Sequence, residues 1–245
     1  MKGVILAGGS GTRLHPLTRI TNKHLLPLYD RPMVTYTVEA LVRAGIDELM
    51  LVTGGTHAGE FFRLLGNGQE YGIDRLAYGY QDQAGGIAEA LGLAERFVGR
   101  DKVCVMLADN IFQRSLTPIV ENFARQEKGA RIVLSRVEDD EHLRHLGVAA
   151  MDGDRVTEIV EKPESPPSGF AVTGVYFYDA QVWDVIPTLQ PSGRGELEIT
   201  DVNNWYVGSG QMEADAVGGF WGDAGESIDA YYEVNDFVRH NGVNE

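Results

Sequence analysis

The chain begins with a short apolar strand that runs straight into a glycine-rich turn. The strand is predicted over residues 2–7, and the turn spans residues 8–14 with the sequence GGSGTRL. Glycines let backbone N–H groups approach a polyphosphate that a Cβ atom would hold away, and successive N–H groups form an anion-binding nest. Arg13 and Lys23 would add positive charge to that nest. The sequence therefore predicts a site for a phosphate-bearing ligand at the end of the first strand.

Two common phosphate-binding motifs do not fit this turn. A P-loop carries Lys-Ser or Lys-Thr directly after its last glycine, and neither pair occurs here. A dinucleotide fingerprint that starts at Gly9 needs a glycine at position 14, where the chain has Leu14. Pro16 follows too soon for a long helix that caps a phosphate. The turn therefore indicates a different class of phosphate-binding protein.

The overall charge restricts the partners of the chain. Its 245 residues carry a formal net charge of −15 at pH 7, which argues against nucleic acid or an anionic membrane as the main partner. An acidic protein that binds phosphates must gather its few cations in one place, and we expect it to need a metal ion. The only cysteine is Cys104, so an intramolecular disulfide is excluded. Neither a signal peptide nor a membrane span is recognisable, and we therefore expect a cytoplasmic protein.

Apolar β-branched runs alternate with segments of helical period through the first half. This alternation predicts an α/β fold with a doubly wound, mostly parallel sheet whose site lies at the carboxyl ends of the strands. Strands are predicted at residues 2–7, 48–53, 74–80, 103–107 and 131–137, and helices at residues 32–44, 57–65, 86–97 and 118–128.

The second half of the chain has a different pattern. Asp152-Gly153-Asp154 lies between two alternating segments and predicts a β-hairpin. Strands are predicted further on at residues 171–178 and 212–217, and helices at residues 180–187, 199–207 and 226–239. Residues 1–245 should form a single domain.

Three polar side chains are candidates for chemistry. Asp109 follows the strand at 103–107, and Asp223 lies in a glycine-flanked turn. Two carboxylates with substrate phosphates are a usual way to hold Mg²⁺, although each aspartate alone could equally serve as a turn residue. The amide of Gln81 offers a donor and an acceptor, which suits the O4/N3–H edge of thymine or uracil. An exposed residue at a strand end is the alternative for Gln81.

The whole chain resembles the sugar-1-phosphate nucleotidyltransferases, and within them the enzymes that join dTTP to glucose 1-phosphate. Motifs of that family occur in the family's order at residues 6–14, 23–27, 109–112, 161–163, 171–178 and 194–201. The resemblance implies a Rossmann-like nucleotidyltransferase fold, with a nucleotide-binding half at 1–110 and a sugar-binding half at 111–245 that includes the hairpin. It also implies formation of dTDP-glucose and pyrophosphate by direct, Mg²⁺-assisted in-line attack.

The resemblance assigns roles to particular residues. The catalytic residues would be Arg13, Lys23, Asp109 and Lys162, with Asp109 and Asp223 as metal ligands. The nucleotide would be bound by Leu6, Ala7, Gly8, Gly9, Ser10, Gly11, Thr12, Arg13, Gln81 and Gly86. The sugar phosphate would be bound by Asn110, Gly147, Glu161, Lys162, Val172 and Arg194.

Several positions depart from the family pattern. Leu146 precedes Gly147 where tyrosine is usual, and Glu89 stands where glutamine is common. These differences leave the identity of the sugar open. A preference for UTP or for another hexose 1-phosphate is one alternative, and a non-catalytic sensor of sugar nucleotides is another. Long family members continue with further helices, so their regulatory site is not expected here. We expect a homo-oligomer that uses other surfaces.

Overall fold

The core of the molecule is a set of four parallel strands. The computed structural model describes residues 1–9 and 11–245. Strands β1 (Lys2–Ala7), β4 (Glu48–Gly54), β5 (Arg75–Gln81) and β6 (Val103–Leu107) lie side by side in the order β6-β1-β4-β5. Ile5 of β1 lies opposite Leu51 of β4 and Met106 of β6. The carboxyl ends of these strands therefore meet at one edge of the sheet.

The sheet continues beyond β6 with strands from the second half of the chain. Strand β11 (Phe170–Tyr178) runs antiparallel to β6, to β8 (Ala130–Arg136) and to β9 (Gly147–Asp152). Strand β12 (Met212–Ala216) pairs in parallel with β8, and β10 (Arg155–Glu161) forms the predicted hairpin with β9. Among the strands of this sheet that the structure describes, only β10 and β11 run against the common direction. The predicted mostly parallel sheet is confirmed.

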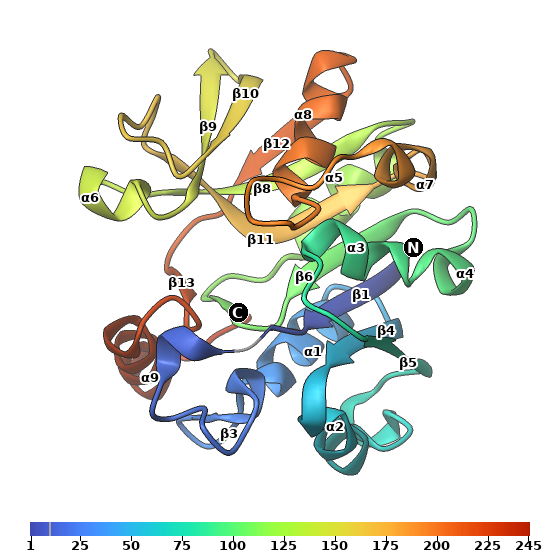
Figure 1. Cartoon of the computed structure of the whole chain (residues 1–245), viewed down its shortest axis with the longest axis vertical. Helices are drawn as coiled ribbons and strands as arrows, with labels where there is room; N and C mark the ends of the chain where they lie inside the picture. Colours follow the sequence, from blue (N-terminus) through green and yellow to red (C-terminus); the bar gives the residue numbers. More distant parts are fainter. Residues whose placement is uncertain (10) are drawn as a thin grey trace.

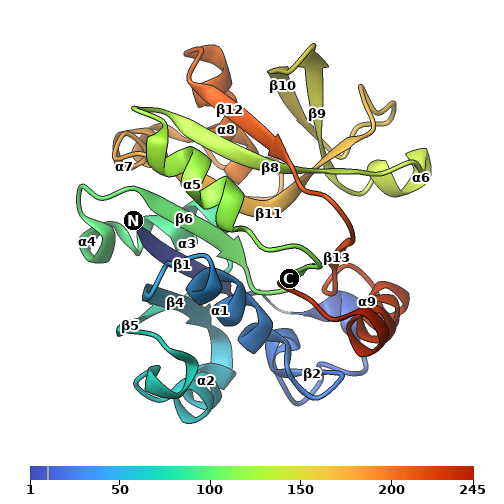
Figure 2. The ribbon, with the colours of Figure 1, turned by 180° about the vertical axis from the view of Figure 1, so that it is seen from behind.

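Helices cover both faces of the sheet. One face packs on α1 (Met33–Arg43), α2 (Ala58–Leu65) and α5 (Thr117–Arg125), and the other on α3 (Ile87–Gly92), α7 (Val182–Val185) and α8 (Ile199–Gly208). Figures 1 and 2 show the two layers from opposite sides. Successive side chains of β1 enter opposite cores, Val4 with Val52 on one face and Ile5 with Leu51 on the other. This alternation produces the doubly wound arrangement that the sequence predicted.

The helix boundaries differ from the prediction at several places. The helix predicted at 86–97 is two helices, α3 and α4 (Glu95–Val98), because Gly92 with its low helix propensity ends the first. The helix predicted at 180–187 is α7 followed by a 3₁₀ turn, Ile186–Thr188, which contains Pro187. The closing helix, α9 (Ile228–Asn241), begins two residues later than predicted.

Several short elements were not predicted. They are β2 (Pro27–Leu28), β3 (Arg31–Pro32), α6 (Asp140–Leu143), β7 (Asn110–Phe112) and β13 (Trp221–Asp223). Strands β7 and β13 pair with each other outside the main sheet. In Figure 1 this pair lies beside the carboxyl end of β6, and the β9–β10 hairpin stands at the end of the molecule remote from β5.

Two further sequence expectations concern burial. Cys104 is completely buried in β6, and burial raises the pKa of its thiol, as expected for an inert side chain. Among residues 1–9 and 11–245, no helix is long and apolar enough to cross a membrane.

Candidate active site

The two predicted metal ligands are neighbours because of the short β7–β13 ladder. Asp109 lies just beyond the end of β6, and Asp223 ends β13, where it pairs with Asn110 of β7. The backbone N–H of Ala224 donates to the Asp109 carbonyl at 2.9 Å. Two carboxylates that are 114 positions apart in the chain therefore face the same site.

Lys23 is the cation closest to this pair. Its Nζ lies 2.5 Å from Asp109 Oδ2, and both side chains are largely buried. Burial alone would raise the pKa of Asp109, but the Lys23 charge and the bonds from Lys23 and His24 hold it well below its usual range. Burial also opposes charge on Lys23, whereas Asp109 and Asp223 raise its pKa. Lys23 and Asp109 therefore form a charged pair at neutral pH.

The pKa of Asp223 is shifted in the opposite direction to that of Asp109. Burial, followed by the negative charge of Asp109, raises the pKa of Asp223 to about 7. The single ammonium of Lys23 thus faces two carboxylates. It neutralises the charge of Asp109, and the charge of Asp223 is left without a cation of its own. His24 adds none, because burial lowers the pKa of its ring, which lies 3.7 Å from Asp109 Oδ2.

This charge balance fits a divalent cation. Where the structure is described, no group of three or more Asp, Glu, His or Cys side chains is arranged to hold a metal by itself. The protein would supply two oxygen ligands, Asp109 and Asp223. This number suits a cation that takes its remaining ligands from substrate phosphates and water. The backbone of Gly225 lies directly against Asp109 and Lys23, since a Cβ there would overlap Asp109 Oδ2 and lie 2.6 Å from Lys23 Nζ.

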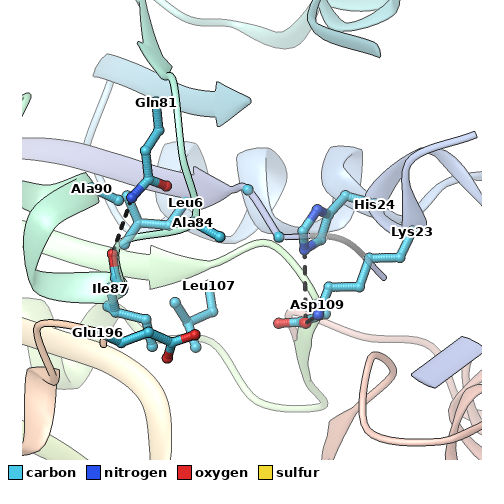
Figure 3. A pocket seen from close by; sticks show the side chains of 13 residues that line it. Leu6, Lys23, His24, Gln81, Ala84, Ile87, Ala90, Leu107, Asp109 and Glu196 are labelled. Carbon is cyan, nitrogen blue, oxygen red and sulfur yellow. Dashed lines mark hydrogen bonds and ion pairs between the residues drawn. The ribbon is translucent and has the colours of Figure 1, made fainter. Parts of the chain in front are cut away.

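A first cavity of about 200 Å³ lies on the β1–β5 side of Asp109, and we call it the nucleotide cavity after the ligand that the sequence predicts for its residues (Figure 3). Seven predicted residues line it: Leu6, Gly8, Gly9, Gln81 and Gly86 of the nucleotide set, and the catalytic candidates Lys23 and Asp109. The Gln81 amide nitrogen donates to Glu89 Oε1 at 2.9 Å and to the Gly86 carbonyl at 3.3 Å. Both N–H groups are thus engaged within the protein, and the amide offers its carbonyl oxygen rather than the predicted donor–acceptor pair.

Gly86 is a glycine for a reason that the sequence did not reveal. Its φ is +101°, and a Cβ would meet the backbone of Leu197. Leu197 N donates to the Gly85 carbonyl at 2.8 Å, and Ala88 N donates to the Leu197 carbonyl at 3.2 Å. The close approach therefore fixes the turn before α3 against the loop that carries Glu196 into the cavity.

A second cavity, of about 280 Å³, lies on the other side of Asp109, and we call it the sugar cavity after the ligand that the sequence predicts for its residues. All six residues predicted for the sugar phosphate line it: Asn110, Gly147, Glu161, Lys162, Val172 and Arg194. Glu161 and Gly147 are paired across the β9–β10 ladder, so the hairpin forms one wall. Arg13, Lys23, Asp109 and Asp223 also contribute to the lining.

The polar groups of the sugar cavity differ in how far the protein already engages them. Asn110 Oδ1 accepts from Gly174 N at 2.8 Å and from Trp221 Nε1 at 2.7 Å, so this oxygen holds β7, β11 and β13 together. Arg194 donates to both carboxylate oxygens of Glu198 at 2.9 Å. Within the described residues, Lys162 has no ion-pair partner, and its φ of +48° places it in a sharp turn after β10.

Some predicted nucleotide contacts lie elsewhere. Ala7, Gly11 and Thr12 are not among the described residues that line either cavity, and Ser10 lies outside the described residues. Ala7 is fully buried, and its carbonyl accepts from Asn22 and Thr53 at 3.3 Å. It therefore supports the turn from behind.

Other residues at the site were not predicted, because apolar residues and glycines carry no chemical signal in the sequence. They include Ile87, Leu107, Tyr176, Trp221 and Gly225. Lys23, Ile87, Leu107, Asp109 and Glu196 line both cavities, so the two spaces share one wall. A phosphate at that wall would lie beside Asp109, one of the two predicted metal ligands, from either side.

Comparison with known proteins agrees with this geometry. The Nucleotidyl transferase family model matches residues 2–241. A glucose-1-phosphate thymidylyltransferase of Neisseria meningitidis serogroup A is 42% identical over 98% of this chain and 83% of its own length. One of Xanthomonas campestris pv. campestris is 40% identical over 97% of this chain and 80% of its own length.

A solved structure is also similar throughout. It is described as a glucose-1-phosphate thymidylyltransferase of Bacillus anthracis in complex with sucrose. It is 46% identical, has a TM-score of 0.93, and the match covers 100% of this chain and 98% of that chain. The resemblance found in the sequence motifs is confirmed: the chain belongs to the nucleotidyl transferase family.

Proposed function

We propose that the protein transfers a thymidylyl group from dTTP to glucose 1-phosphate, giving dTDP-glucose and pyrophosphate. The observation that carries this proposal is the pair of cavities that meet at Lys23 and Asp109, with Asp223 on the side of the second cavity. The shared wall thus brings a cation and a carboxylate to the place where two phosphate-bearing substrates would meet. The names of the similar proteins support the same substrates.

The two cavities divide the proposed substrate contacts between them. Leu6 and Leu107 would pack against the base, and Gln81 would contact its polar edge. Glu161 would accept hydrogen bonds from sugar hydroxyls beside Gly147. This division partly supports the assignment of residues 1–110 to the nucleotide and 111–245 to the sugar. The residues that cross it are Arg13, Lys23, Ile87, Leu107, Asp109, Asn110 and Glu196.

The chemistry requires positioning and charge neutralisation more than a protein nucleophile. The phosphate oxygen of the sugar attacks the α-phosphorus of dTTP in line, and pyrophosphate leaves. Lys162 and Arg194 would hold the sugar phosphate, and Arg13 with the glycine-rich turn would stabilise the leaving pyrophosphate. Arg194 would then share its guanidinium between the phosphate and Glu198. Mg²⁺ held by Asp109 and Asp223 would neutralise phosphate charge and bring the two anions together.

The test is pyrophosphate release measured for every combination of dTTP, UTP, CTP, ATP and GTP with several hexose 1-phosphates. We expect dTTP with glucose 1-phosphate to be the best pair and UTP to follow modestly, since the 5-methyl group adds one small apolar contact. CTP and the purines should be poorer by about tenfold or more, the cost of a mispaired buried polar group. A better rate with UTP or another hexose would replace the substrate assignment, and no turnover with any pair would favour a sensor.

A homo-oligomer and a cytoplasmic location are further parts of the proposal. The backbone N–H of Tyr29 donates to Asn235 of α9, the helix that also carries Tyr232. The side chains of Tyr29 and Tyr232 are exposed and offer apolar surface for a second copy. Light scattering should give a multiple of 26.9 kDa, and a particle of that mass itself would contradict the oligomer.

A further inference from the structure

Glu89 holds the Gln81 side chain in one orientation. Gln81 ends β5, and Glu89 lies in the first turn of α3, with Glu89 Oε1 2.9 Å from Gln81 Nε2. The second polar contact of the same nitrogen is the Gly86 carbonyl at 3.3 Å. A carboxylate and a carbonyl can only accept hydrogen bonds, so the amide nitrogen must face both of them.

The carboxylate of Glu89 occupies a place that the turn leaves open for it. A Cβ on Gly85 would overlap that carboxylate, so glycine is required there while Glu89 keeps this position. The bonds between Leu197 and the turn fix the backbone at Gly85 and Ala88. The orientation of Gln81 is therefore built into the start of α3.

With its nitrogen held in this way, Gln81 presents its oxygen to the nucleotide cavity. Figure 3 shows the amide with its nitrogen toward the start of α3 and its oxygen turned away. This oxygen lies near Gly8, where a Cβ would come within 3.3 Å of it. Because Gly8 has no side chain, the oxygen remains open toward the cavity.

We propose that Glu89 is a positioning residue for base selection: it fixes Gln81 as a hydrogen-bond acceptor, so that the enzyme takes a pyrimidine with an N3–H donor. Thymine and uracil have that donor. Cytosine carries an unprotonated N3, whose lone pair would face the lone pairs of the Gln81 oxygen. The inference rests on the proposed function, and it assigns the rejection of CTP to a repulsive contact that Glu89 enforces.

Two variants of Glu89 test this role. In Glu89→Gln the new side chain can either accept a hydrogen bond from the Gln81 amide or donate one to it. In Glu89→Ala the Gln81 amide loses this hydrogen-bond partner. Either change lets Gln81 turn and give an N–H to cytosine N3. The ratio of kcat/KM for dTTP to that for CTP should fall by about tenfold, as expected for one polar contact in a buried site. The rate with dTTP should fall less than this ratio, and KM for glucose 1-phosphate should not change.

Glu95→Gln is the matched control, because Glu95 is an exposed carboxylate at the start of the neighbouring α4. A double-mutant cycle with Gln81→Ala separates positioning from a general loss of structure. If Glu89 acts through Gln81, Glu89→Gln changes the ratio in the parent and has no further effect in Gln81→Ala.

An unchanged ratio in Glu89→Gln, or an equal effect of Glu89→Gln with and without Gln81, would overturn the inference. Glu89→Gln keeps the size of the side chain and therefore decides the matter even where Glu89→Ala does not fold. Failure of the proposed function gives a different result, since the parent protein would then not release pyrophosphate from dTTP.

Discussion

At the residue scale, the two aspartates of the site are held in unlike ways. Asp109 is paired with Lys23, whereas Asp223 accepts a hydrogen bond from Gly225 N at 2.8 Å. The charge of Asp223 is disfavoured by burial and by Asp109, which raise its pKa to about 7. Replacing the two carboxylates should therefore have unequal effects on stability, although both should stop the reaction.

Asp223→Asn should lower kcat by about a hundredfold or more, since charge at a preorganised phosphate site is worth several kcal/mol. Its thermal unfolding temperature should stay the same or rise, because asparagine keeps the acceptor for Gly225 and removes a buried like charge. Pyrophosphate release and calorimetry on the same preparation measure both effects. Near parental turnover in this variant would remove Asp223 from the metal site.

Asp109→Asn should be inactive and also less stable. It leaves the buried ammonium of Lys23 without its closest partner, and breaking a buried pair costs about 3–5 kcal/mol. Lys23→Met combined with Asp109→Asn should recover much of that stability without activity. Stability of Asp109→Asn equal to that of the parent would show that the pair contributes nothing to the fold.

At the scale of elements, the β7–β13 ladder builds the site and was the part least open to prediction. Three-residue strands have too few positions for an alternating pattern, and β13 contains Gly222 between Trp221 and Asp223. Strands β1, β4, β6 and β8 were predicted because their apolar runs are buried on both faces. The residues of the sugar cavity could be predicted only through the family resemblance, since bare Glu161-Lys162-Pro163 carries no chemical signal.

The close approach of Gly225 gives a test of this ladder. In Gly225→Ala the new methyl group would press on Asp109 and Lys23, so activity should fall by about ten- to a hundredfold, as for small displacements of catalytic groups. Gly218→Ala is the matched control, because a Cβ there meets nothing within 4 Å. Equal activity of the two variants would argue against a tight Gly225 contact.

A second contact between elements is sensitive to pH. His142 of α6 lies 2.9 Å from Glu226 in the turn before α9, and this hydrogen bond is the main cause that raises the pKa of His142 and lowers the pKa of Glu226. The stabilisation from His142 is fully present below its ordinary pKa of 6.5 and is lost as pH rises through the raised value. The part from Glu226 is present above 4.5 and is lost as pH falls through the lowered value.

The difference in unfolding free energy between the parent and His142→Gln should therefore be largest between about pH 4.5 and 6.5. The pair is partly exposed, so the difference should be about 1 kcal/mol or less. Urea unfolding at pH 5.5 and pH 8.5 measures it. His240→Gln is the control, because that ring contacts a backbone carbonyl, that of Asp236, instead of a carboxylate. The same difference at both pH values would contradict the ion pair.

At the scale of the whole molecule, the fold depends on its apolar cores and not on the proposed metal site. The two largest cores lie on opposite faces of the sheet, and the β7–β13 ladder is closed by its own hydrogen bonds. Chelation by EDTA should therefore abolish turnover while the unfolding temperature changes by no more than about 2 °C, well under the shift for the loss of one core contact. Added Mg²⁺ should restore the rate. Turnover that persists in EDTA would contradict metal assistance.

The wall that the two cavities share has a consequence for the product. Lys23 and Asp109 border both spaces, so the sugar nucleotide would lie astride them as one molecule with an anchor on each side. A ligand with one binding group in each cavity loses its translational freedom only once. Its second group then binds as if it were present at a high local concentration. The enzyme would therefore hold its own product like a bisubstrate inhibitor, and each turnover would end with a molecule that displaces both of the starting compounds.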